Sequence, residues 1–430
     1  MSERPNTRTT ADEPDTPGHV VIIGAGGVGL CCGYYLQRGG VAVTIIERGR
    51  VGRGCTTGSA GWLCPSETLP LPAPGVQRYA LRSLAPTSPL HFNLAKLPAL
   101  APWLLRFWRN CNATTYGRGR AALAALGSAT FGLIEEMLDD GVGLDLFRQG
   151  MVYALSDADA ARTALHALEP LREYGVSLPR EVLIGGELQA VEPALSSSVG
   201  AGFVFDGHWH LRPDSFTDGL AKVLRARGAE ILEHTSVTSF DTEGTRVRAA
   251  HTSGGDVEGD AFVAASGVWT PHLAAKLGVK VPVQAGKGYS FSVSPQVMPA
   301  HSIDLTQAHL ACTPFRDELR IAGTMEFDGL DTRINQRRLA HVVGAARHAL
   351  LPWAHSEIRD VWTGLRPVTA DGLPIIDRCC ANAFVATGHA MLGVHLAAPT
   401  GATLADFILG RSRPAVLEPF QLGRRTLGRR

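Results

Sequence analysis

The stretch HVVIIGAGGVGL (residues 19–30) decides the fold, because a short β-branched run is followed at once by glycines. Gly24, Gly26 and Gly29 satisfy the pattern G-x-G-x-x-G. The first glycine permits a tight turn, the second lets the backbone approach a pyrophosphate, and the third allows a helix to pack closely on a strand. The stretch predicts a strand, a turn and a helix whose N-terminus faces phosphate groups.

The residues that follow complete this unit. We expect the helix to cover residues 28–38 and VAVTIIE (residues 41–47) to form a second strand. Glu47 lies 18 residues after Gly29, where a carboxylate can accept hydrogen bonds from ribose hydroxyls. The glycine pattern alone is weak evidence, but an ordinary strand–turn–helix would not require all these features together. The unit predicts a Rossmann-type dinucleotide site.

The next segment, RGRVGRGCTTGSAGWLCPSE (residues 48–67), has the composition of a loop. A nicotinamide-binding domain would usually enter another helix at this point. A glycine-rich loop instead lets the backbone approach a larger cofactor that continues past the pyrophosphate. The loop therefore favours FAD over NAD.

Composition limits the classes of function. The 430 residues are 45% hydrophobic and carry a net charge of +1, so nothing globally basic indicates a nucleic-acid partner. The eight cysteines include two adjacent pairs and no C-x-x-C, which suits free thiols in a reducing cytoplasm. His208 and His210 are two residues apart and lack a third ligand nearby, so we predict no metal site and a pocket rim or structural role for them.

Residues 1–18 are polar and lack an apolar signal core, so we expect a disordered leader and a cytoplasmic protein. We expect no stretch of about 18 apolar residues long enough to span a bilayer. The basic residues in 421–430 are interpreted as a solvated tail. The protein would then be soluble, or at most attached to a membrane surface.

The sequence resembles the D-amino-acid oxidase superfamily from about residue 19 to residue 410, and most closely the small subunit of bacterial D-amino-acid dehydrogenases. Four segments carry the resemblance: residues 58–76, 287–293, 362–378 and 387–408. The resemblance implies a non-covalently bound FAD. Motif and resemblance together assign the following residues to cofactor binding: Gly24, Gly26, Gly29, Glu47, Arg48, Thr56, Ala60, Gly61, Val237, Gly267, Gly388, His389, Met391 and Gly393.

Arg366 is the main candidate for substrate binding. It stands in a Gly-Leu-Arg-Pro sequence, read as a turn, before a second turn at Asp371 and Gly372. A surface arginine is the alternative, but the family's arginine for the substrate carboxylate occupies this position, and its planar fork suits a carboxylate. Related oxidases add a tyrosine from a strand that here reads HLACTPF (residues 309–315) and has none. Tyr289 could substitute, although tyrosine in a strand usually packs.

The predicted fold is α/β, with a Rossmann-type FAD domain and a second domain built on a mostly antiparallel sheet. The FAD domain is assigned to residues 19–84, 211–279 and 360–420, and the substrate domain to residues 85–210 and 280–359. The glycine-rich loop at residues 387–393 precedes a helix that we expect to begin near Thr400, and its N–H groups would face the flavin. His389 in this loop is interpreted as a hydrogen-bonded structural residue and not as a base.

The resemblance implies oxidative deamination of D-amino acids to 2-oxo acids and ammonia, with electrons passed to a quinone-like acceptor. Two alternatives stay open: oxidation of secondary amines such as sarcosine, proline or hydroxyproline, and a flavin-bearing subunit that works with a second subunit. LPALAPWLLRFWRN (residues 97–110) fits a helix that either touches a membrane surface through its tryptophans and arginines or packs inside the substrate domain.

Overall fold

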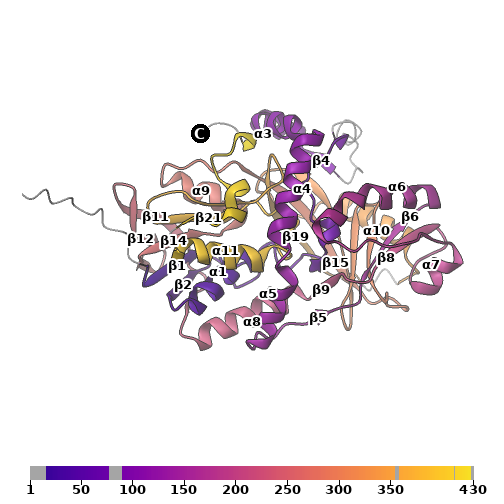
Figure 1. Cartoon of the computed structure of the whole chain (residues 1–430), viewed down its shortest axis with the longest axis horizontal. Coiled ribbons are helices and arrows are strands. Elements are labelled where there is room, and N and C mark those ends of the chain that lie inside the picture. Colours follow the sequence, from indigo (N-terminus) through magenta and orange to yellow (C-terminus); the bar gives the residue numbers. More distant parts are fainter. Residues whose placement is uncertain (1–15, 77–89, 354–357, 411, 428–430) are drawn as a thin grey trace, which may run out of the picture.

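A computed structural model describes residues 16–76, 90–353, 358–410 and 412–427, and Figure 1 gives the arrangement of its elements. The first sheet has the strand order β10-β2-β1-β14-β21-β20, and all its neighbouring pairs are parallel except β20 with β21. Its strands are β1 (His19–Ile23), β2 (Ala42–Ile46), β10 (Glu230–Leu232), β14 (Ala261–Ala264), β20 (Ile375–Arg378) and β21 (Ala383–Thr387).

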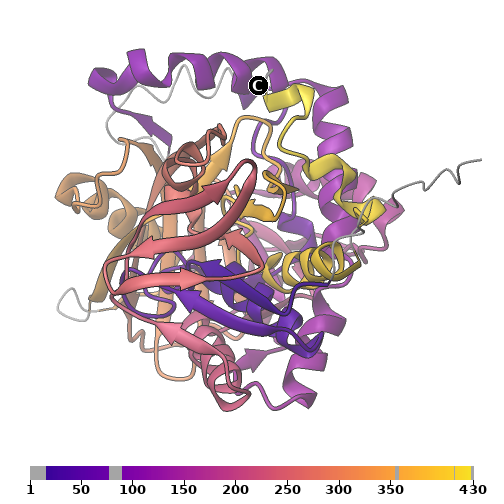
Figure 2. The same ribbon diagram turned by 90° about the vertical axis from the view of Figure 1, so that its left-hand side faces the viewer.

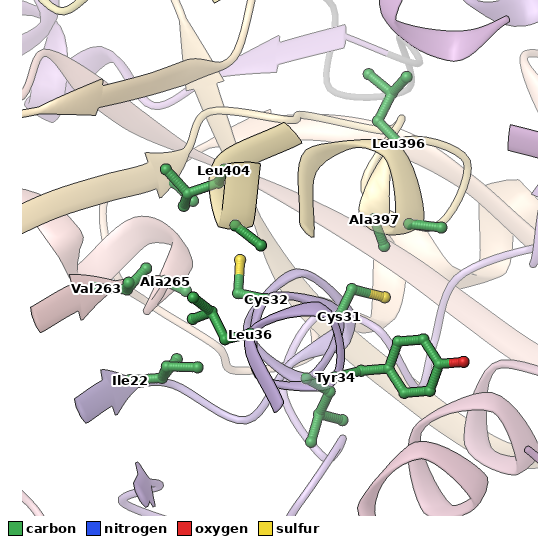
Figure 3. Packing of buried hydrophobic residues seen from close by; sticks show 14 of the residues in the cluster. Ile22, Cys31, Cys32, Tyr34, Leu36, Val263, Ala265, Leu396, Ala397 and Leu404 are labelled. Carbon is green, nitrogen blue, oxygen red and sulfur yellow. The ribbon is translucent and has the colours of Figure 1, made fainter. Parts of the chain in front are cut away.

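The predicted strand–turn–helix unit is present. Helix α1 (Gly27–Arg38) begins one residue before the expected start, and β1 pairs in parallel with β2. Helix α11 (Ala397–Gly410) packs against α1, and in Figure 3 Cys31 and Cys32 point from α1 toward it. The two helix backbones lie close, since a Cβ on Gly401 would stand 2.5 Å from the Cys31 carbonyl carbon.

Helix α11 begins three residues before the predicted start at Thr400. The N–H of Thr400 already donates to the carbonyl of Leu396 at 3.0 Å, so helical hydrogen bonding is established upstream. Pro399 does not prevent this, because the first turn of a helix needs no N–H donor at that position.

Other elements cover this first sheet. Helix α8 (Pro213–Ala226) packs beside α1, while a three-stranded antiparallel sheet lies over the opposite face, as Figure 2 shows. Val247 and Ala250 of that small sheet are buried in one cluster with Val21, Ile46 and Phe262. Its strands are β11 (Val237–Glu243), β12 (Arg246–Thr252) and β13 (Gly255–Glu258).

The second large sheet is mostly antiparallel, as predicted, with the order β19-β15-β18-β17-β16-β6-β8-β7 and β4 paired to β18. Helix α10 (Gln336–Ala349) covers one face over a core that includes Phe291, Ile303 and Ile321. The strands are β4 (Leu90–Phe92), β6 (Met151–Leu155), β7 (Leu183–Ile184), β8 (Ala201–Phe205), β15 (Val283–Val293), β16 (Ser302–Leu305), β17 (Leu310–Pro314), β18 (Leu319–Phe327) and β19 (Arg359–Thr369).

The remaining elements connect the two large sheets. The short strands β3 (Trp62–Leu63), β5 (Leu146–Phe147) and β9 (Trp209–Leu211) form a second small sheet. The remaining α-helices are α3 (Leu97–Asn110), α4 (Ala113–Gly127), α5 (Thr130–Asp139), α6 (Ala158–Leu168), α7 (Gly186–Val191) and α9 (Thr270–Ala275). In Figure 1, α4 and α5 run between the first sheet and the second.

Two expectations from the sequence are corrected here. The stretch Ala113–Asp139 is long and apolar enough by composition to cross a bilayer, contrary to the expectation that no stretch is. Its apolar residues Leu123, Leu126 and Ile134 are buried in the same core as residues of α11, and this packing explains why the stretch is apolar. The C-terminal tail is also not simply solvated, because Arg424 pairs with the buried Asp371 (Nε–Oδ2 2.6 Å). Residues 1–15 of the leader and 428–430 of the tail lie outside the described residues.

Candidate active site

The predicted cofactor glycines gather at one edge of the first sheet. The parallel strands β1, β14 and β21 are neighbours, so their carboxyl ends meet at the same edge. Gly24, Gly267 and Gly388 follow these ends with φ angles of 114°, 58° and 84°, a region that suits glycine. The hydroxyl of Thr387 donates to the carbonyl of Gly267 at 2.8 Å and ties two of the turns together. Ligands of open α/β sheets bind outside such an edge.

Glu47 and the start of α1 lie at the same edge. One carboxylate oxygen of Glu47 accepts from the N–H of Ala25 at 2.9 Å and the other from the N–H of Gly49 at 2.8 Å. The N–H of Gly27 donates to the hydroxyl of Thr56 at 3.1 Å. Gly29 is required sterically, because a Cβ there would stand 1.9 Å from the carbonyl oxygen of Gly24.

Three other predicted cofactor residues, Arg48, Gly61 and Val237, have identifiable neighbours in the structure. The guanidinium of Arg48 lies over the ring of Trp269, 3.5 Å from its centroid. Gly61 follows Ala60, has a φ of 71° and leaves no room for a Cβ, which would lie 1.9 Å from the carbonyl oxygen of Leu211. Val237 stands at the start of β11, two residues after Thr235, whose N–H donates to the carbonyl of Glu47.

The final glycine-rich loop is attached to strand β19. His389 forms an isolated bridge with Val368, and the N–H of Ala390 donates to the carbonyl of Pro367 at 2.9 Å. His389 hydrogen-bonds to the hydroxyl of Thr400 at 3.0 Å, and burial lowers its pKa to about 3, which supports a structural role over that of a base. Met391 is 57% exposed, so its side chain stands apart from the buried members of the loop.

Arg366 does not stand in a turn, as the sequence suggested, but inside strand β19. Pro367 can follow Arg366 in the strand because the hydrogen bond with the loop uses only the Pro367 carbonyl, which accepts from the Ala390 N–H. The guanidinium lies over Gly288 of β15, where an added Cβ would meet it at 2.3 Å, and its Nη1 donates to the carbonyl of Thr324 at 2.6 Å.

Arg366 as a whole residue is half-buried. Burial lowers the pKa of Arg366, which the neighbouring Cys55 partly opposes. Within the described part of the chain, no carboxylate lies within 4.0 Å of it. A buried guanidinium with one carbonyl partner has donors left for a planar anion such as a substrate carboxylate.

Tyr289 is not a partner of this arginine, and the expectation that it could assist is corrected. It is fully buried, and its hydroxyl donates to Glu326 Oε2 at 2.7 Å. Side chains alternate along a strand, and Arg366 pairs with Gly286, so Tyr289 belongs to the opposite face of the sheet.

The loop after Thr56 crosses the face that carries Arg366. A Cβ on Gly58 would collide with the Trp362 ring at 2.0 Å, and the carbonyl of Thr57 accepts from Arg320 Nη1 at 2.8 Å. Further along, Trp62 Nε1 donates to the hydroxyl of Thr313 at 2.9 Å. The loop that follows Thr56 is therefore packed against the second sheet.

A buried polar cluster lies further along the same sheet. The hydroxyl of Tyr153 donates to Glu67 and is 2.8 Å from the Ser66 hydroxyl, which is 2.5 Å from His208 Nε2. Burial raises the pKa of Glu67, while burial and the neighbouring Glu67 raise the pKa of Asp304.

The two histidines proposed as a pocket rim or structural pair are buried. Burial lowers the pKa of His208 to about 3 and that of His210 to about 4. His210 bonds to the carbonyl of Pro314 at 2.8 Å and to the hydroxyl of Ser302 at 3.0 Å. Both therefore serve as neutral structural residues, and no group of three or more potential metal ligands occurs among the described residues.

Comparison with protein families identifies the chain. Residues 19–407 match the family described as FAD dependent oxidoreductase. The chain belongs to this family. It is 30% identical over 408 residues to the D-amino acid dehydrogenase of Granulibacter bethesdensis, covering 92% of this chain and 97% of that protein. It is 32% identical over 410 residues to that of Paramagnetospirillum magneticum, covering 91% and 95%.

Solved structures of FAD-family oxidoreductases share the fold. Glycine oxidase from Geobacillus kaustophilus superposes with a TM-score of 0.73 at 23% identity, covering 95% of this chain and 98% of that one. L-proline dehydrogenase from P. horikoshii gives a TM-score of 0.70 at 18% identity, covering 95% and 97%. The protein is thus an FAD-dependent oxidoreductase of the D-amino acid dehydrogenase type.

The residues at the edge of the first sheet fit FAD. A Cβ added to Gly26 would meet its nearest atom at 3.6 Å, one on Gly393 at 3.9 Å, and one on Gly267 nothing within 4 Å. These glycines therefore border open space along the expected course of the cofactor. The hydroxyls of Ser59 and Ser290 are buried without a hydrogen-bond partner among the described residues. A polar ring system would satisfy them.

Sequence reasoning missed several residues of this space. Trp362, Arg320, Cys55, Ser290 and Thr324 enter it from strands or loops whose pairing brings them together. The alternation of small residues in AGKGYS (residues 285–290) was the only available signal, since glycines inside a strand indicate a close approach by another group.

Replacing Arg366 with alanine should leave FAD bound and lower kcat/KM on the order of a hundredfold or more, because a charge-assisted bidentate pair is lost. Lysine should rescue poorly, since it lacks the planar fork. Steady-state kinetics with flavin content measured in parallel will check this. Arg359→Ala, at the exposed start of the same strand, is the matched control and should behave as wild type. Near-normal kinetics of Arg366→Ala would remove this residue from the site.

Proposed function

We propose that the protein oxidatively deaminates D-amino acids to 2-oxo acids and ammonia. The observation that carries the proposal is the buried guanidinium of Arg366, which has no carboxylate partner in the described chain and lies on the strand that holds the final FAD loop. The curated relatives named D-amino acid dehydrogenase support the substrate class. Two electrons and two protons leave the amino acid, and water then hydrolyses the imino acid to a 2-oxo acid and ammonia.

The chain's own residues would bind, orient and enclose the substrate. FAD, when bound non-covalently in the cradle described above, supplies the acceptor for the hydride from the α-carbon. Arg366 would hold the carboxylate, and Trp362 with the loop at residues 55–62 would exclude water. Burial lowers the pKa of His208, His210 and His389, which makes each a weak base, so we expect the amine to lose its proton to solvent.

D-amino acids should reduce the bound flavin faster than their L-isomers under anaerobic conditions, an expectation that rests on the similarity to relatives named D-amino acid dehydrogenase. Paired D- and L-alanine, proline and hydroxyproline can be compared by flavin bleaching. Faster reduction by L-isomers would contradict the proposal. Reduction by N-alkyl amino acids alone would select the secondary-amine alternative, and no bleaching with a co-purifying protein would favour the flavin-subunit alternative.

We further propose that a quinone-like molecule accepts the electrons at a membrane surface on the cytoplasmic side. Helix α3 supports this, although its two tryptophans differ: one is in the core and the other is at the surface. Trp103 is only 4% exposed and stacks near Phe107 and Phe327, so it belongs to the core. Leu105 and Trp108 instead are 54% and 55% exposed.

Basic residues accompany this exposed apolar side of α3. Arg109 is exposed on the helix, and Arg425 is exposed on the adjacent C-terminal segment, where Asn110 donates to the carbonyl of Thr426 at 3.0 Å. Figures 1 and 2 place α3 at one end of the molecule beside the C-terminus. An outward tryptophan and leucine with flanking cations suit the surface of an anionic bilayer.

The reduced flavin should be reoxidised slowly by oxygen and quickly by a soluble quinone. Stopped-flow absorbance after anaerobic reduction with a D-amino acid measures both rates in one preparation. Equal rates would make the protein an oxidase and remove the acceptor proposal, whatever the outcome of membrane binding.

The intact protein should float with vesicles that contain anionic lipid and remain behind with neutral ones. Trp108→Ser should reduce flotation several-fold without changing thermal stability, because its ring is exposed. Trp103→Ser is the contrasting variant and should lower stability instead, since its ring is buried. Equal flotation of wild type and Trp108→Ser would contradict a membrane-facing α3.

A further inference from the structure

Thr324 has a backbone conformation that a β-branched residue rarely adopts. Its φ is 61°, in the left-handed region, although it lies in the middle of strand β18 (Leu319–Phe327). Such strain persists only where the surrounding structure fixes it, and it gathers at binding sites. Glycine would be the ordinary choice here, and Gly323 stands immediately before it.

A β-bulge produces this conformation. Tyr289 of β15 pairs with Gly323 and Lys287 pairs with Glu326, so Thr324 and Met325 together oppose the single residue Gly288. Gly288 is also the residue over which the guanidinium of Arg366 lies. The bulge turns the carbonyl of Thr324 out of the strand pairing and toward Arg366 Nη1, 2.6 Å away.

The side chain of Thr324 is the second observation. The residue is 9% exposed, and its hydroxyl is buried without a hydrogen-bond partner among the described residues. A buried hydroxyl without a partner is unfavourable unless a ligand supplies the missing hydrogen bond. The carbonyl of the same residue accepts a hydrogen bond from Arg366, so Thr324 is a direct neighbour of the guanidinium that we propose to bind the carboxylate.

We infer that Thr324 is a second anchor for the substrate carboxylate, with its hydroxyl donating a hydrogen bond to the carboxylate that Arg366 binds. This rests on the proposed function and deepens it. A carboxylate accepts several hydrogen bonds, and one arginine edge supplies only part of them. The strand expected to carry an assisting tyrosine has none, and Tyr289 faces the other side of the sheet. Thr324 supplies a hydroxyl from the neighbouring strand.

The test uses the oxidised FAD-loaded protein titrated with benzoate, a carboxylate probe, and with benzamide, which has the same ring and no charge. Flavin absorbance reports binding without turnover. Thr324→Val, which removes the hydroxyl and keeps the shape, should raise the Kd for benzoate about tenfold. It should leave the Kd for benzamide unchanged. Thr324→Ser should stay within about twofold of wild type, and the KM for a D-amino acid should rise more than kcat falls.

Two control variants separate loss of the Thr324 hydroxyl from effects of position and of folding. Thr363→Val makes the same substitution on β19 at a position paired with Tyr289, on the opposite face, and should not change either Kd. Thr324→Gly removes the hydroxyl while relieving the left-handed strain, so it should fold at least as well as wild type and still bind benzoate weakly. Wild-type affinity for benzoate in Thr324→Val or Thr324→Gly would overturn the inference.

The outcome also separates this inference from the proposed function. Loss of benzoate binding in Arg366→Ala together with unchanged binding in Thr324→Val would overturn only the role of Thr324. Unchanged binding in both variants, or no benzoate binding by wild type, would overturn the carboxylate site itself and the inference with it.

Discussion

The rest of the site depends on one buried positive charge, the guanidinium of Arg366. Enclosing a charge in protein is costly unless hydrogen bonds or an opposite charge compensate for it, and within the described chain its partner is a single carbonyl. The surrounding sequence accommodates this group: Gly288 leaves room beneath it, and the bulge at Thr324 directs a carbonyl to it. The proposed role of Arg366 would complete the arrangement, with a substrate carboxylate taking the donors that remain.

The two large sheets are joined where this charge lies, and this couples cofactor and substrate. The N–H of Ala390 in the final loop donates to the carbonyl of Pro367, one residue after Arg366. This backbone hydrogen bond connects the loop at the cofactor edge directly to the strand that carries Arg366. From the other side, the loop that caps α1 through Thr56 continues to contact Arg320 and Trp362 of the second sheet. A displacement of either sheet would therefore move the cofactor edge relative to the arginine, and the proposed reaction would depend on that geometry.

The enclosed polar groups are largely neutral, which fits chemistry that needs orientation more than proton transfer. Burial lowers the pKa of His208, His389 and His395 to about 3 to 4, and it raises the pKa of Glu67 and Asp304. Hydrogen bonds among these groups, such as Tyr153 to Glu67 and His389 to Thr400, hold the interior in place.

The sequence by itself determined the parts of this protein that depend on local chain geometry. The strand–glycine–helix unit, Glu47 at the end of the second strand, the helix at residues 97–110 and the mostly antiparallel second sheet were all predicted, because spacing of glycines and alternation of apolar residues specify them within short segments. Arg366 was selected through the family resemblance. Its position in a strand, and not in a turn, appeared only in the structure, since pairing of β19 with β15 overrides the local preference of Gly and Pro. The face to which Tyr289 points, the outward position of Trp108 and the bulge at Thr324 were decided by tertiary structure alone. Strand register and the packing of distant segments fix which side of an element faces the site, and no short stretch of sequence contains that information.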